Sequence, residues 1–109
     1  MRAGDSHGGC VMTNQKLAEA LLFHASQIVA IAPGLEPRRD IEAPRAEERG
    51  QLAHVLWMCD EAVTFIADGK IDKAMRWLGF IQGALWVMGV STIEESKRAN
   101  MPQGEEYKP

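Results

Sequence analysis

The chain has 109 residues, enough for one domain with one hydrophobic core. Hydrophobic residues make up 46% of it and charged residues 25%, which is typical of a globular rather than a disordered protein. The formal net charge of −3 provides no basic surface for a phosphate backbone and argues against nucleic acid as the main partner. Cys10 and Cys59 have no companions at metal-ligand spacing, so we expect no metal and no structural disulfide, in a reduced cytoplasmic protein.

Both ends of the chain are expected to lie outside the folded part. Residues 1–12 are polar and glycine-rich, which indicates a disordered leader rather than a signal peptide, and Met12 is a candidate natural start. Residues 101–109 should form a flexible tail. A single helical domain is therefore expected over residues 13–100. The apolar run 77–90 is shorter than the about 20 residues of a membrane span, so we expect no membrane association.

The first helix is predicted over residues 13–31. Thr13 or Asn14 can cap its start, and Pro33-Gly34 follows its end. Its apolar residues repeat at helical spacing and form one stripe: Leu17, Leu21, Ala25, Ile28. His24 lies on the same stripe. For His24 we favour a structural role at the helix margin, bonded to backbone or water, over a catalytic one.

A proline-rich linker is predicted over residues 33–44, and it contains the pair Arg38-Arg39. Acidic residues flank this pair, which favours a solvated linker over a phosphate site. The second helix is predicted over residues 44–68, where apolar residues repeat on one face: Leu52, Val55, Leu56, Cys59, Ala62, Val63, Ile66. Trp57 projects almost opposite this face, which suggests a second contact surface.

A tight turn at Gly69 should join the second helix to a third over residues 70–90, giving an antiparallel hairpin. The stretch FIADGKIDKAMRWL resembles the inter-helix turn of tetratricopeptide repeats, with Gly69 followed five residues later by the small Ala74. No second repeat exists upstream, so this resemblance implies hairpin geometry alone. Ser91 or Thr92 should cap a last short helix over residues 92–99. The predicted fold is all-α: this hairpin packed with the first helix and the short last helix.

The third helix is apolar on nearly every side, which predicts burial on every side. Two neighbouring helices cover only part of it, so an apolar patch should remain and a homodimer or higher symmetric oligomer should bury it. Gly79 and Gly83 lower helix stability by about 1 kcal/mol each, which indicates a close helix approach, either inside the hairpin or between subunits. The predicted oligomer interface is Trp77, Gly79, Phe80, Gly83, Ala84, Val87.

Arg76 is the one basic residue in this apolar neighbourhood, and it should lie level with Ala62 or Val63 across the hairpin, with Asp60 and Glu61 within one turn of it. A structural ion pair is the favoured role for it. Alternatively, a cation beside aromatic rings suits a phosphorylated or nucleobase-bearing small molecule. The predicted ligand- or partner-binding residues are Trp57, Arg76, Trp77, Phe80, Gln82.

Nothing in the sequence predicts catalysis. His54 and Cys59 lie five residues apart on one helix and therefore on different faces. The acidic pairs 47–48 and 94–95 lie at helix starts, where the helix dipole explains them. There is no glycine-rich phosphate loop, so we expect no cofactor and no enzymatic activity.

The words LWMCDEA and DKAMRWLGFIQGALWVMG resemble small accessory proteins encoded by tailed phages and prophages. Those proteins commonly carry a Leu-Trp-Met motif, followed along the chain by Arg-Trp-Leu-Gly and Gln-Gly motifs. The matching residues are Leu56, Trp57, Met58, Arg76, Trp77, Leu78, Gly79, Gln82, Gly83. The likeness spans residues 51–102 and leaves the first helix and the linker uncovered. It implies an accessory protein that modulates or evades host processes in the host cytoplasm.

Three functions follow as hypotheses. The leading one is a non-enzymatic helical oligomer that binds a host protein or modulates a defence process. The second is an oligomer that sequesters a nucleotide signal between its helices. The third, a DNA-binding regulator, is disfavoured by the acidic balance and the lack of a basic recognition helix.

Overall fold

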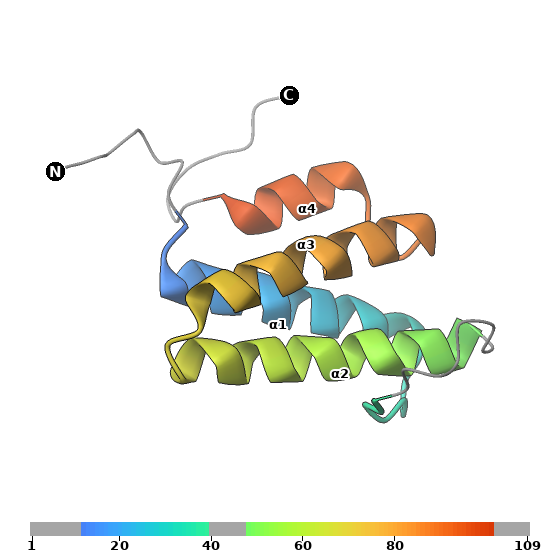
Figure 1. Ribbon diagram of the computed structural model, residues 1–109. Helices are drawn as coiled ribbons and strands as arrows, with labels where there is room; N and C mark the ends of the chain where they lie inside the picture. The colour runs from blue at the N-terminus through green and yellow to red at the C-terminus, as the bar shows by residue number, and fades with distance from the viewer. Residues whose placement is uncertain (1–11, 40–47, 102–109) are drawn as a thin grey trace, which may run out of the picture.

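The computed structural model describes residues 12–39 and 48–101. This part of the chain forms α1 (Asn14–Ile31), α2 (Glu48–Ala67), α3 (Ile71–Val87) and α4 (Ile93–Asn100), and it contains no strand. The three long helices lie side by side, and α4 lies along α1 and α3 on the side away from α2 (Figure 1). The predicted all-α fold with an antiparallel α2–α3 hairpin is confirmed. None of the helices in residues 12–39 and 48–101 is long and apolar enough to cross a membrane.

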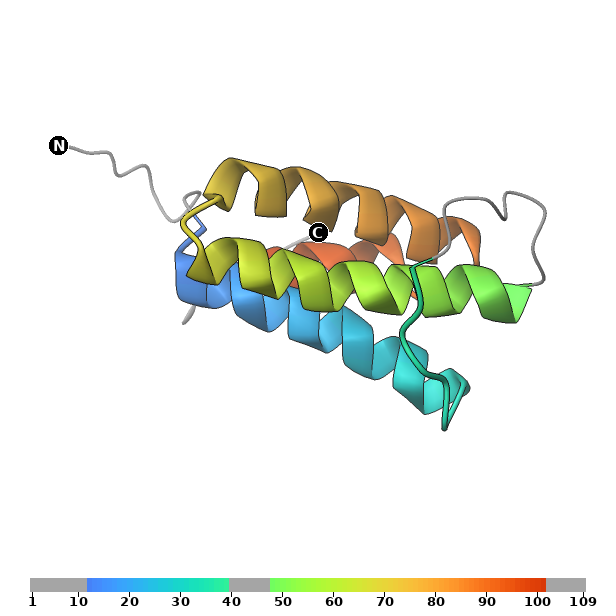
Figure 2. The same ribbon diagram turned by 60° about the horizontal axis from the view of Figure 1, so that its bottom comes forward.

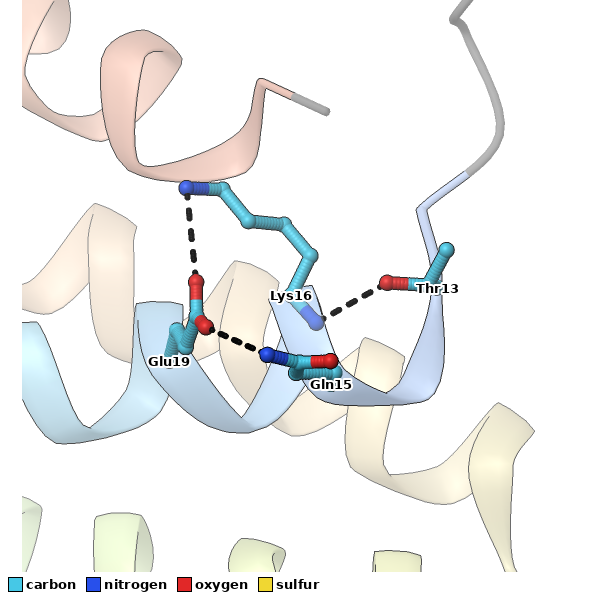
Figure 3. Close-up of polar contacts among 4 residues, drawn as sticks. All are labelled: Thr13, Gln15, Lys16 and Glu19. Carbon is cyan, nitrogen blue, oxygen red and sulfur yellow. Dashed lines mark hydrogen bonds and ion pairs between the residues drawn. The ribbon is translucent and has the colours of Figure 1, made fainter. Parts of the chain in front are cut away.

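The helix ends follow from local hydrogen bonding. At the start of α1, the Thr13 hydroxyl accepts a hydrogen bond from the Lys16 backbone N–H at 3.0 Å, as an N-cap does (Figure 3). In the same turns, the Glu19 carboxylate accepts a hydrogen bond from Gln15 and lies 3.8 Å from the Lys16 ammonium (Figure 3). At α4, Thr92 rather than Ser91 is the N-cap, and Glu95 completes a capping box.

Two glycines with positive φ end the helices of the hairpin. Gly69 has a φ of +81°, and the next residue's N–H donates to the Phe65 carbonyl at 2.7 Å, which closes the predicted turn. Gly89, with a φ of +77°, ends α3 at Val87, before the predicted end at residue 90. The predicted start of the second helix at residue 44 lies outside the described residues, as do residues 1–11 of the predicted leader and the tail beyond Met101. Met12, the last residue of that leader, is half-buried and packs against the core.

The core lies between α1, α2 and α3. α1 contributes the fully buried Leu17, Leu21 and Ile28, and the small residues Ala62 of α2 and Ala74 of α3 are fully buried as well. Only one side of α3 enters this core: Ala74, Leu78, Ile81, Leu85. The expectation that α3 is buried on every side is therefore not met within a single chain. Its opposite side is open.

The segment after α1 returns to α2. The Arg38 backbone N–H donates a hydrogen bond to the Ala53 carbonyl at 3.1 Å, so this segment crosses the first half of α2 (Figure 2). Ala53 is buried although it lies away from the α2 stripe that faces the core. The described part of the linker is therefore attached to α2 and does not run free between helices.

Candidate functional site

The most conspicuous surface is the side of α3 that faces away from the bundle. We call it the α3 outer face and define it by Met75, Gly79, Phe80, Gly83, Trp86 and Val87. Phe80 is 60% exposed and Val87 is 76% exposed, although both are large apolar side chains. Met75 and Trp86 are 47% and 56% exposed. These side chains are apolar, and the exposed Arg76 lies on the same side of α3, so the face is an apolar surface with one positive charge. Soluble proteins usually cover apolar surfaces of this kind.

This surface differs from the predicted patch in four residues: it lacks Trp77 and Ala84, and it includes Met75 and Trp86. Trp77 and Ala84 are only half-exposed, because they lie on the side of α3 that turns toward α2. Trp86 was missed. It lies eight positions after Leu78, about 80° around the helix from the core-facing side. That angle could have identified Trp86 as a residue of the open face.

Gly79 and Gly83 lie exposed in the middle of the α3 outer face. A Cβ added at either glycine would have no heavy atom within 4 Å, apart from neighbouring backbone of α3 itself. Close packing inside the hairpin therefore does not explain them, and that alternative is wrong. Both glycines line the groove between Met75 and Val87 that a straight helix leaves at i, i+4 spacing.

We predict that Gly79→Ala and Gly83→Ala each raise the free energy of unfolding of the monomeric chain by about 1 kcal/mol. Alanine has the higher helix propensity, and the new methyl group meets open space. Urea unfolding at low chain concentration measures this. If the same variants weaken self-association in light scattering, the groove is where another helix comes close. A loss of monomer stability would contradict the open environment described above.

An aromatic cluster joins α2 to α3 beside the outer face. The Trp57 and Trp77 ring centroids lie 5.9 Å apart, and Phe65 meets Trp77 edge-on at 4.7 Å. Two cations lie over these rings: Lys73 at 4.5 Å from Phe65, and Arg39 at 5.8 Å from Trp57. Trp57 and Trp77 remain half-exposed. Two of the predicted binding residues thus share one site, flanked by positive charge.

Arg76 does not belong to that cluster. Its side chain is exposed, and no ion pair joins it to Asp60 or Glu61, so the predicted pairing is wrong. Arg76 lies about 160° around α3 from the buried Leu78, so it points away from the core. Lys73, rather than Arg76, is the α3 cation that lies over the aromatic rings.

Gln82 lies on the other side of α3 from the aromatic cluster. Its Nε2 donates to Nε2 of His24 at 3.0 Å and to Oδ1 of Asn100 at 2.7 Å. Gln82 therefore connects α3 to α1 and α4 and does not share a site with Trp57 and Trp77. His24 itself is fully buried and bonds to side chains, so its predicted place at the helix margin, bonded to backbone or water, is wrong. Spacing within one helix gave no signal for these contacts between helices.

A groove with a volume of about 480 Å³ lies between α1 and α4. Phe23 and two alanines provide its apolar lining, and Lys16, Glu19, Glu95 and Arg98 provide its charges. Positive and negative groups balance, and Lys16 is already paired with Glu19. The groove therefore has no net charge that would select an anionic or cationic ligand.

The described residues contain no group of three or more His, Cys, Asp or Glu side chains that could hold a metal ion. Cys59 is buried, and desolvation by burial, with the nearby Asp60 charge adding to it, raises the pKa of its thiol to about 12. Such a thiol is not a nucleophile at neutral pH. The absence of catalytic activity stays a prediction.

We predict that Cys59 resists alkylation in the folded protein. At about pH 8 the thiolate form is scarce and the sulfur is out of reach of the reagent. Mass spectrometry after iodoacetamide treatment should show modification of Cys59 only when denaturant is present. Rapid native modification would mean that α2 opens readily at this position.

Comparison of the chain with protein-family models, curated proteins and solved structures gives no match. The resemblance to tailed-phage accessory proteins therefore stays a prediction.

Proposed function

We propose that this chain is a non-enzymatic accessory protein of the tailed-phage type, which forms a symmetric oligomer through the α3 outer face and acts by binding a host protein. The observation that carries the proposal is the exposed apolar surface of α3 around Phe80 and Val87. Each large apolar side chain left in water forgoes about 1.5–3 kcal/mol of burial. A surface of this kind is typical of a protein whose role is association.

Self-association covers this surface without requiring a second, different surface on a partner. In a two-fold dimer one patch serves both subunits, so the α3 helices of two chains lie near the axis. The groove at Gly79 and Gly83 supports a close approach of the two helices, because no side chain of the same molecule fills it.

A host protein would then contact the half-exposed aromatic pair Trp57 and Trp77. Tryptophan is enriched among residues that dominate binding energy at protein interfaces. The test is capture of proteins from host lysate on immobilised wild-type chain and on Trp57→Ser, with Glu94→Lys as the control variant. A protein retained by wild type and by Glu94→Lys, and lost with Trp57→Ser, supports the proposal. If all three chains retain the same proteins, or if no protein is retained, the result counts against the proposal.

A second candidate function is sequestration of a small nucleotide. It rests on the same aromatic pair, because Arg39 and Lys73 place positive charge over rings on which a nucleobase can stack. Thermal melting with a panel of cyclic nucleotides tests this. A ligand at 100 times its dissociation constant adds about 2.7 kcal/mol to the stability of the folded protein. A panel that leaves the melting temperature unchanged excludes this candidate.

A further inference from the structure

Three positively charged side chains gather around the first turns of α3. Lys70, Lys73 and Arg76 line a shallow hollow of about 370 Å³, and Asp72 lines it with them. Lys70 and Arg76 are exposed, and Lys73 is half-buried. We call this recess the cationic hollow. It gives a chain with a net charge of −3 a positively charged recess on its surface.

The cations of the hollow are not neutralised by the protein. None of the three forms an ion pair with an acidic side chain within residues 12–39 and 48–101, not even with Asp72. Three cations against the one carboxylate in the lining leave two positive charges in excess. Like charges held close together repel one another. An anion bound among them would remove that repulsion.

Lys73 connects the cationic hollow to the aromatic cluster. Its ammonium lies 4.5 Å from the Phe65 ring centroid and 5.8 Å from the Trp77 ring centroid, and the same side chain lines the hollow. Trp77 lies 5.9 Å from Trp57, and both of these rings are half-exposed. The hollow and the aromatic pair are thus one side chain apart, so one small molecule with an aromatic end and an anionic end can contact both.

The charge of the hollow selects among phosphate groups. A phosphomonoester carries a charge of about −1.5 to −2 at pH 7 and presents three acceptor oxygens. This charge matches the two excess positive charges, and ammonium and guanidinium groups form strong hydrogen bonds to phosphate oxygens. A cyclic nucleotide carries a phosphodiester with a single negative charge, which leaves part of the excess unbalanced. The hollow therefore favours a terminal phosphate over a cyclic one.

We propose that the cationic hollow and the Trp57–Trp77 pair form one binding site for a 5′-nucleotide. The base stacks on the indole rings, as nucleobases do on exposed aromatic side chains. The 5′-phosphate lies among Lys70, Lys73 and Arg76. The proposal rests on the second candidate function and goes beyond it, because it selects a nucleotide with a terminal phosphate over a cyclic nucleotide.

Titration calorimetry of the full chain tests the proposal with four probes: AMP, 3′,5′-cyclic AMP, adenosine and inorganic phosphate. AMP should bind most tightly. Adenosine lacks the negative charge and inorganic phosphate lacks the base, so each should bind at least about tenfold more weakly. Cyclic AMP keeps the base but not the terminal phosphate, and it should also bind about tenfold more weakly than AMP.

Two variants separate the contact to the phosphate from the contact to the base. Lys70→Gln should fold, because the hydrogen bonds of Lys70 to Phe65 and Ala74 use its backbone atoms. It should weaken AMP binding about tenfold and leave adenosine binding unchanged. Trp57→Ser should weaken the binding of AMP and adenosine alike, by about fivefold or more. The matched control Arg98→Gln removes an exposed cation of α4 and should change neither.

Equal binding of AMP and adenosine would overturn the proposal, as would wild-type AMP binding in Lys70→Gln. An equal loss of AMP binding in Arg98→Gln would also overturn it, because the effect would then not depend on the hollow. Inorganic phosphate that binds as tightly as AMP would refute the role of the aromatic pair. Cyclic AMP that binds as tightly as AMP would refute the choice of a terminal phosphate and leave the second candidate function standing. If no nucleotide binds, both fail.

Discussion

A Phe80→Glu variant should behave as a monomer of 12.1 kDa under conditions in which the wild-type chain forms a dimer of twice that mass. The Phe80 ring is 60% exposed on the α3 outer face, so its loss removes little from the core of the single chain. In a two-fold dimer the change occurs twice, and two carboxylates then face an apolar interface. Losing about 1.5–3 kcal/mol at each ring raises the dissociation constant by roughly a hundredfold to ten-thousandfold.

Light scattering coupled to gel filtration measures this mass directly. Glu94→Lys is the matched control because Glu94 is an exposed residue on α4, away from the α3 outer face, and unlike Glu95 it makes no capping-box bond. It should leave the mass unchanged. A wild-type chain that is itself a clean monomer at micromolar concentration would refute the oligomer.

Leu85→Ala should lower the free energy of unfolding by about 2–5 kcal/mol. Leu85 is fully buried where α3 enters the core, so truncation removes apolar contacts and leaves a cavity. The comparison is Val87→Ala, two positions along the same helix, where the side chain is 76% exposed and the expected change is within about 0.5 kcal/mol.

Urea unfolding measures both changes, and the Phe80→Glu background keeps association from contributing to either. Nearly equal losses at the two positions would contradict the assignment of Leu85 to the core and Val87 to the surface.

The helices and their order were predictable because their signals are local. Periodic apolar residues, the Thr13 cap and the glycine at residue 69 each depend on neighbours within a few positions. The end of α3 was less certain, since an apolar sequence continues past Val87 and only the positive φ of Gly89 ends the helix. Local pattern therefore predicts where a helix lies, and predicts its ends less well.

The side-chain partners were less predictable because they depend on rotation about the helix axis and on distant segments. The predicted hairpin register placed Asp60 and Glu61 within one turn of Arg76, but the exposed Arg76 side chain points away from the core. The hydrogen bond between Gln82 and His24 joins residues 58 positions apart, and the residue spacing within either helix does not predict it. Trp57 and Trp77 were grouped correctly, because both lie beside the contact between α2 and α3.

The position of α1 also bears on the order in which the chain folds. α2 and α3 are joined by a tight turn and can pair early, since closing a short loop requires little entropy. α1 instead packs against α2, α3 and α4, which all follow it in the chain. During synthesis α1 leaves the ribosome before α2, α3 and α4, so its contacts with α4 must await residues 93–100. We therefore expect α1 to remain available to chaperones or to other chains until α4 has been synthesised.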